Sequence, residues 1–216
     1  MRDLKIRASC VGKIMTDPRT KCEGILSVGA KTYLRELAKQ EIFGIEFEIG
    51  SKEMAKGIEV EQDSIDLLND VRGLHLQKNT ERRTNDWITG ECDLFDAAAG
   101  KGYDIKSSWS AKTFPGWQAD CGDKVYEWQM RAYMWLWDAD EWEVVHTLVD
   151  TPERLIGFEP LQMHIVSHIP KHMRLTGWLV ERDFEKERLM RERVEAAREY
   201  VLEVIQQFDE LHLEMA

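Results

Sequence analysis

The pattern of apolar and polar positions changes along the chain from helical to strand-like and back. Two early stretches, 27–43 and 52–71, carry apolar residues at intervals of three or four. Each is followed by a glycine suited to end a helix, Gly44 and Gly73, so we predict two helices there. The stretch 183–211 has the same spacing among many charges and predicts a long C-terminal helix.

The middle of the chain has the short apolar runs and turn residues of a β-sheet. The runs 74–79, 87–96 and 101–107 are separated by turn residues and predict antiparallel strands. The remaining expected elements are a helix at 123–137, a strand at 141–150, a helix at 152–169 and a strand at 175–181. The complete order of elements predicts an α/β fold in which a central mixed β-sheet is flanked by helices.

Length and composition indicate an ordinary globular chain. It has 216 residues, of which 43% are hydrophobic and 32% charged. Because domains have about 150 residues and no linker-like segment occurs, we expect a single domain over 1–216. No apolar run approaches the ~18 residues of a membrane span, and the N-terminus lacks the apolar core of a signal peptide. We therefore expect a cytoplasmic protein without a membrane partner.

Cysteine spacing and net charge narrow the possible partners. Cys10, Cys22, Cys92 and Cys121 form no CxxC pair, which indicates free thiols and not a zinc or disulfide site. The net charge of −11 argues against a protein that coats DNA, because such proteins neutralise phosphates with basic residues. DNA stays possible if basic residues line one channel, or if metal ions neutralise acidic groups that face the phosphate.

Two aspartates and a lysine form the candidate chemistry. Asp104 and Lys106 are two apart on a predicted strand, so they share a face, and a hairpin would bring Asp93 close to Asp104. Two such carboxylates raise each other's pKa unless a cation lies between them, and oxygen ligands suit Mg²⁺ or Mn²⁺. A lysine beside that metal can hold a water or stabilise an oxyanion, as phosphodiester hydrolysis requires. Alone, an Asp-x-Lys triplet is in most chains an exposed strand edge with a surface ion pair that contributes little.

Further segments occur in a fixed order around these residues. Residues 8–15 contain Ala-Ser and then Gly-Lys-Ile-Met, residues 57–61 read Gly-x-x-x-Glu, residues 129–133 read Gln-x-x-x-Tyr, and 180–183 read Val-Glu-Arg-Asp. Together with the Asp-x-Lys strand, they resemble the PD-(D/E)XK nuclease superfamily. Within it the chain is most similar to phage recombination exonucleases of the lambda exonuclease and YqaJ type, which are related to the RecB nuclease domain. The resemblance implies a restriction-endonuclease-like core.

The resemblance implies a role for each residue of the central motif. Asp93 and Asp104 would bind the metal ion, with the carbonyl oxygen of Ile105 as a further ligand. Lys106 would position the attacking water. These roles would make the three side chains and one carbonyl the core of a catalytic Mg²⁺ or Mn²⁺ site.

Two helices would complete the site in this resemblance. Glu61 would bind a metal ion or orient its water, and Gln129 would bond to the metal-site water or shape the cleft. Glu59 is the alternative to Glu61, and the acidic helix that carries both can also be a solvated face. Gln129 can also be an ordinary helix residue.

The N-terminal segment resembles a pocket for a 5′-phosphate. Ser9 can donate to a phosphate, and a helix that starts there would offer free N–H groups to an anion. Arg2, seven residues before the serine, matches the arginine of that pocket, and Arg7 lies beside the motif. Either arginine can bind phosphate or belong to an unstructured terminus.

The resemblance also implies an activity and partners. We expect a Mg²⁺- or Mn²⁺-dependent exonuclease that digests double-stranded DNA from a 5′ end and leaves a 3′ overhang, in the cytoplasm of a bacterial host cell. A homo-oligomer, with a trimeric ring as one form, and a single-strand annealing recombinase are the expected protein partners. The alternatives are an endonuclease of the same superfamily and a non-catalytic DNA-binding or assembly subunit with the same fold.

Overall fold

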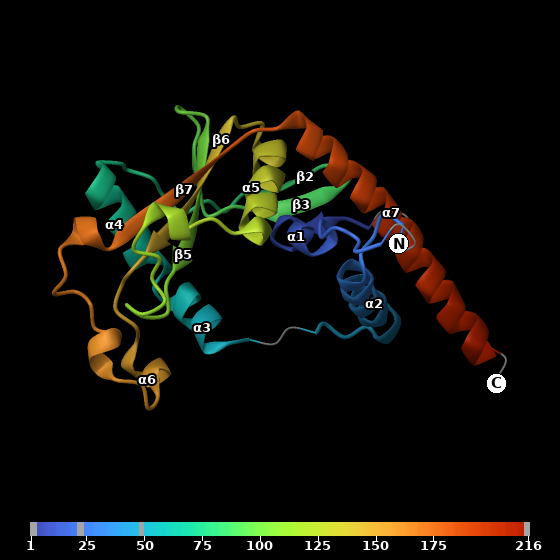
Figure 1. Ribbon diagram of the computed structural model, residues 1–216, viewed down its shortest axis with the longest axis horizontal. Helices are drawn as coiled ribbons and strands as arrows, with labels where there is room; N and C mark the ends of the chain where they lie inside the picture. The colour runs from blue at the N-terminus through green and yellow to red at the C-terminus, as the bar shows by residue number, and fades with distance from the viewer. Residues whose placement is uncertain (1–3, 21–23, 48–49, 214–216) are drawn as a thin grey trace.

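The computed structural model describes residues 4–20, 24–47 and 50–213 (Figure 1). In this part of the chain the strands form two mixed sheets. The fold class expected from the sequence is confirmed, but the strands divide between two sheets instead of forming one. The first sheet has the order β1-β3-β2, with β1 Ile6–Arg7, β3 Ile88–Glu91 and β2 Arg82–Thr84. The second has the order β4-β5-β6-β7, with β4 Leu94–Asp96, β5 Lys101–Ser107, β6 Glu141–Thr147 and β7 Leu175–Glu181.

The helices flank these sheets, and α7 extends past them alongside α2 (Figure 1). No helix in the described ranges is long and apolar enough to cross a membrane. The α-helices are α1 Val11–Ile14, α2 Val28–Phe43, α3 Lys52–Glu59, α4 Glu61–Arg72, α5 Lys124–Trp137, α6 Glu153–Ile156 and α7 Phe184–Leu213. The short 3₁₀ turns are η1 Ala8–Cys10, η3 Gln118–Asp120, η4 Leu161–Met163 and η5 Lys171–Met173.

Side chains of β6 pack into apolar cores on both faces of the second sheet. Trp142 belongs to the larger apolar core, which also contains Met130 of α5 and Val194 of α7. Val145 belongs to a smaller core with Ile65 of α4. Because neighbours on a strand point to opposite faces, β6 separates α5 and α7 from α4.

The connection from β5 through α5 to β6 places a helix next to the strand with the Asp-x-Lys motif. β5 and β6 are parallel neighbours, so the chain must cross over between them, and α5 lies in this crossover. Asp123 starts α5 by accepting hydrogen bonds from the N–H groups of Val125 and Tyr126. β4 and β5 form an antiparallel hairpin whose turn includes Gly100 at φ +63°.

Four sequence predictions differ from the structure. The helix expected over 52–71 breaks at the buried Val60 into α3 and α4. The strand expected at 74–79 is absent from the fold, because the side chain of Asn69 instead bonds both backbone groups of Leu76. The expected strand 87–96 divides into β3 and β4, which belong to different sheets.

The helix expected over 152–169 was also wrong. Only the four residues of α6 are α-helical, and Gly157 then takes φ +66° and ψ −123°. Pro160 follows and precedes the short η4 turn. Glycine and proline therefore interrupt the helical apolar spacing, as their backbone preferences dictate. The single domain expected over 1–216 stays a prediction.

Candidate active site

Strands β4 and β5 carry the residues on which the predicted chemistry depends. Asp104 and Lys106 share one face of β5, and the Lys106 Nζ lies 2.7 Å from the Asp104 Oδ2. Asp93 directly precedes β4, and its Oδ2 accepts a hydrogen bond of 2.6 Å from the backbone N–H of Ile105. The hairpin thus brings the two aspartates and the lysine together, in the arrangement expected from the sequence.

Burial leaves the carboxylates of this group with too little compensating charge. Asp104 is only 1% exposed, and its Oδ2 receives no hydrogen bond within the described residues. Lys106 forms an ion pair with that oxygen, but the angles between the two groups do not meet the criteria for a hydrogen bond. Burial, and next the charge of Asp104, raise the pKa of Asp93 to about 7.

Lys106 keeps its proton in this environment. Burial by itself lowers its pKa, but the charge of Asp104 and the contact with it outweigh that effect. The net pKa is therefore raised above the usual lysine value. The ammonium also lies over the ring of Tyr126, 4.6 Å from its centroid. A lysine in this state is a donor to water or phosphate oxygens and not a proton acceptor.

Gln129 of α5 connects the helix to both members of the Asp-x-Lys pair. Its Nε2 donates to Asp104 Oδ1 at 3.1 Å and to the Tyr133 hydroxyl at 3.1 Å. Its Oε1 accepts from Lys106 Nζ at 3.5 Å. Tyr133 in turn donates to the backbone carbonyl of Glu91 at 3.1 Å, so the amide orientation is fixed at both ends. Gln129 is therefore in contact with the aspartate–lysine group, and its functional role stays a prediction.

A cleft of about 470 Å³ opens beside these residues, which we call the catalytic cleft. Glu61, the first residue of α4, lines it and is paired with Lys78. The alternative, Glu59, pairs with Arg154 and does not line the cleft. The structure thus places Glu61, and not Glu59, at the cleft, and its role there stays a prediction. The lining residues are Met54, Gly57, Ile58, Glu61, Lys78, Asp93, Ile105, Lys106 and Ser107.

Sequence reasoning did not identify Lys78 as a site residue. It lies on the irregular segment after α4, which the apolar pattern had predicted as a strand. Its contact with Glu61 joins residues 17 apart, and no spacing rule indicates such a pair. The pKa of Lys78 is raised, first by its hydrogen bond to Glu61.

The residues present fit a divalent cation with oxygen ligands. Within the described ranges, no three His, Cys, Asp or Glu side chains lie together closely enough to hold a metal ion. Mg²⁺, however, commonly uses one or two carboxylates and keeps waters or substrate phosphate oxygens as its other ligands. The buried Asp104 oxygen that receives no hydrogen bond and the raised pKa of Asp93 are what two such ligands show when no metal ion compensates them.

Comparison with known proteins identifies the family of the chain. No family model and no curated protein matches the chain. The crystal structure of a phage-related exonuclease from Haemophilus somnus 129PT is 37% identical, with 99% of this chain and 97% of that chain covered and a TM-score of 0.87. The chain belongs to the phage-related, lambda-exonuclease-like exonucleases. An alkaline exonuclease, LHK-Exo from Laribacter hongkongensis, shares the exonuclease fold at 18% identity, with coverages of 100% and 96% and a TM-score of 0.68. Its complex with dAMP is equally similar, at 18% identity and a TM-score of 0.67.

The N-terminal segment of the exonuclease packs beside α5. Ala8 lies against Gly90, where an added Cβ would come within 2.9 Å of it, and Gly12 lies against Val125 at the start of α5. Ser9 is exposed on η1 between these contacts. The segment is therefore held close to the helix that carries Gln129, while the phosphate role of Ser9 stays a prediction.

The two candidate arginines differ in what the structure says of them. Arg7 is exposed at the end of β1, and its charge acts on Tyr33 of α2. Arg2 lies outside the described residues. Both phosphate roles therefore stay predictions.

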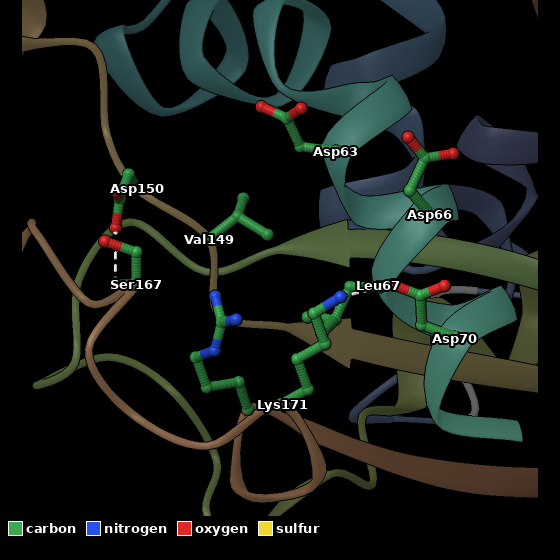
Figure 2. A pocket seen from close by; sticks show the side chains of 9 residues that line it. Asp63, Asp66, Leu67, Asp70, Val149, Asp150, Ser167 and Lys171 are labelled. Carbon is green, nitrogen blue, oxygen red and sulfur yellow. Dashed lines mark hydrogen bonds and ion pairs between the residues drawn. The ribbon is translucent and has the colours of Figure 1, made fainter.

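A second hollow of the exonuclease, about 230 Å³, lies against another face of α4 (Figure 2). Asp70 is paired with Lys171, and Asp150 accepts hydrogen bonds from the backbone N–H groups of Val166 and Ser167. These aspartates hold neighbouring segments together, so we assign them no part in the chemistry. The lining residues are Asp63, Asp66, Leu67, Asp70, Val149, Asp150, Ser167, Lys171 and Arg174.

Proposed function

We propose that this exonuclease is a Mg²⁺- or Mn²⁺-dependent deoxyribonuclease that digests double-stranded DNA from a 5′ end and leaves a 3′ overhang during phage recombination. The observation that carries the proposal is the pair of Asp93 and the buried Asp104, one oxygen of which receives no hydrogen bond, beside the charged Lys106. The family supports the exonuclease activity. The metal, the polarity and the biological role rest on the chemistry of the donor set and on the resemblance.

The residues divide the reaction between them. Asp93, Asp104 and the Ile105 carbonyl would hold the metal ion, which when bound neutralises phosphate charge and lowers the pKa of water. Lys106 keeps its proton, so it donates a hydrogen bond that orients the attacking water or a phosphate oxygen. Gln129 holds the Asp104 carboxylate and the lysine in place through its amide.

Glu61 acts from the opposite side of the catalytic cleft. Its carboxylate reaches the cleft from the start of α4, and its charge acts on Asp93. Lys78 compensates that charge. Glu61 is thereby placed to accept a hydrogen bond from a water in the cleft, or to add an oxygen to the metal site.

Partners are proposed on the same basis. A protein of charge −11 that acts on DNA needs its basic residues gathered where the phosphates bind. A ring of several copies, with three as one form, would meet this need by enclosing a basic channel. The 3′ overhang would pass to a single-strand annealing recombinase in the bacterial cytoplasm.

One gel assay separates the alternatives. With Mg²⁺, the protein is given linear duplex with a 5′-phosphate, the same duplex with a 5′-hydroxyl, and a closed circle. We expect digestion of the linear DNA, faster with the phosphate, and an intact circle. A cut circle would indicate an endonuclease. No cutting with Mg²⁺ or Mn²⁺ would indicate a non-catalytic subunit.

A single variant tests the lysine. Lys106→Ala should bind metal and DNA as the parent does but lose cleavage by about 100-fold or more, since it removes a donor to the reacting groups. Lys39→Ala, on the exposed side of α2, is the matched control and should cut normally. Cleavage by Lys106→Ala at the parent rate would contradict the assigned role.

A further inference from the structure

A buried lysine attaches α3 to the rest of the protein. Lys56 is 0% exposed and is the buried residue of this eight-residue helix. Two apolar residues of the same helix face solvent instead, Met54 at 59% and Ile58 at 77% exposed. Burial of apolar side chains therefore contributes little to holding α3 in place. Ion pairs at its two ends, Lys52 with Glu159 and Glu59 with Arg154, are exposed, so the buried contacts of Lys56 are the main candidates for holding the helix.

The ammonium of Lys56 uses all three of its donors on backbone carbonyls. Its Nζ donates to Ser108 O at 2.6 Å, to Val149 O at 2.9 Å and to Trp109 O at 3.2 Å. Ser108 directly follows β5, and Val149 lies two residues past β6. Lys56 thus fastens α3 to the ends of two neighbouring strands, and without it three buried carbonyls would lack these donors.

The backbone around the carbonyls that accept from Lys56 is held by further hydrogen bonds. The Trp109 carbonyl also accepts from the Thr151 hydroxyl at 2.9 Å and faces His164 Nδ1 at 3.2 Å. Asp150 follows Val149 and is committed to backbone N–H groups, as the dashed line to Ser167 in Figure 2 shows. Burial lowers the pKa of Lys56 to about 8, and the charge of Asp150 opposes that effect.

We propose that Lys56 is a positioning residue of the exonuclease, which sets the distance between Glu61 and Lys106 across the catalytic cleft. α3 supplies part of the cleft wall, and Glu61 begins α4 two residues after α3 ends. On the other side, Ser108 is two residues past Lys106 on the same strand and loop. The ammonium therefore links the two walls directly. This inference rests on the proposed function of Glu61 and Lys106.

Removal and chemical replacement of the amine test the inference. Lys56→Ala leaves a cavity in the shape of an alkylammonium ion. We expect kcat on linear duplex to fall by about 100-fold, because catalysis is sensitive to displacements of about 1 Å. The Kd for duplex should change by less than about 3-fold. Propylammonium should restore kcat by about 10-fold or more, whereas tetramethylammonium, which has no N–H donor, should not.

Hydrogen exchange supplies a readout that does not need the reaction. In Lys56→Ala, the amides of α3 should exchange faster while those of β5 and β6 keep the parent rate, and propylammonium should slow α3 again. Lys56→Met fills the same volume without donors, so it should show the low kcat and fast α3 exchange without rescue. If Lys56→Ala does not fold, this second variant carries the comparison. Lys39→Met is the control and should match the parent.

Three results would overturn the inference. They are a kcat for Lys56→Met within about 3-fold of the parent, equal rescue by both ammonium ions, or faster exchange throughout the protein instead of in α3. A parent protein that does not cut DNA would instead refute the proposed function. In that case the exchange of α3, with and without propylammonium, still decides whether Lys56 holds the cleft wall.

Discussion

Replacing Asp93 with asparagine should stabilise the metal-free protein. Its carboxyl has a pKa of about 7 in the folded chain against an ordinary value of 3.8. Because one pKa unit corresponds to about 1.4 kcal/mol, ionised Asp93 costs the fold up to about 4 kcal/mol. The asparagine side-chain oxygen can still accept the hydrogen bond from Ile105, so the hairpin contact is kept. Allowing for relaxation around the coupled carboxylates, we expect a gain of about 2–4 kcal/mol.

The pH dependence of that gain has a definite sign. Between about pH 4 and 7 the folded state binds more protons at Asp93 than the unfolded chain does, so stability falls as pH rises through this window. Asp93→Asn has no carboxyl group to ionise at this position, so its stability does not fall for this reason. The difference between variant and parent should therefore be small at pH 4 and complete above pH 7.

Thermal unfolding in EDTA measures the effect. A change of 1 kcal/mol moves the Tm of a protein of this size by about 2–4 °C, so we expect Asp93→Asn to melt about 5–10 °C higher at pH 7.5. Excess Mg²⁺ should raise the Tm of the parent but hardly that of the variant, because a ligand of the folded state stabilises it. Asp209→Asn, exposed on α7, is the control. An Asp93→Asn protein that melts at or below the parent Tm from pH 5 to 8 would refute the reasoning.

Three further predictions concern packing, charge and metal. Gly102→Ala would place a Cβ 2.2 Å from the Trp142 ring, so it should lower the free energy of unfolding, measured by urea titration, by about 3 kcal/mol. Gly116→Ala is the control and should be neutral, because its added Cβ would have nothing within 4 Å. Burial raises the pKa of Glu143, but Arg72 and then Lys101 outweigh burial and hold the pKa low. Arg72→Met leaves Lys101 as the remaining partner, so it should cost about 2 kcal/mol at pH 7 and less at pH 4, where more of the acid is protonated; an equal loss at both pH values would contradict this. EDTA should stop DNA hydrolysis in a gel assay and excess Mn²⁺ should restore it, whereas hydrolysis that continues in EDTA would exclude metal dependence.

Local rules predict the parts of the site that depend on nearby residues. The spacing of Asp104 and Lys106 places both on one face of β5. Capping and stop residues define α2 and α5 to within a residue or two, since Ser27 and Asp123 accept from the first turn and Gly44 takes a positive φ. The hairpin that brings Asp93 to the site follows from the short connection between β4 and β5.

Long-range contacts explain what sequence reasoning could not find. The helix expected over 52–71 breaks at Val60. The part before the break, α3, is held by hydrogen bonds from Lys56 to carbonyls more than 50 positions away in the chain. The irregular segment after α4 is held by the Asn69 side chain and positions Lys78 beside Glu61. In each case a polar side chain bonds partners that only the folded chain brings near, which apolar periodicity does not record.

The crossover from β5 through α5 to β6 has a consequence for how this site can change over evolutionary time. Asp93, Asp104, Lys106 and Gln129 all lie on the β4–β5 hairpin and the helix that follows it. Their mutual contacts all fall within this one continuous segment of the chain, so the segment can be inherited, duplicated or recombined as one module. Glu61 comes from outside the module. Descendants can therefore exchange the helix that faces the module without rebuilding the aspartate–lysine pair.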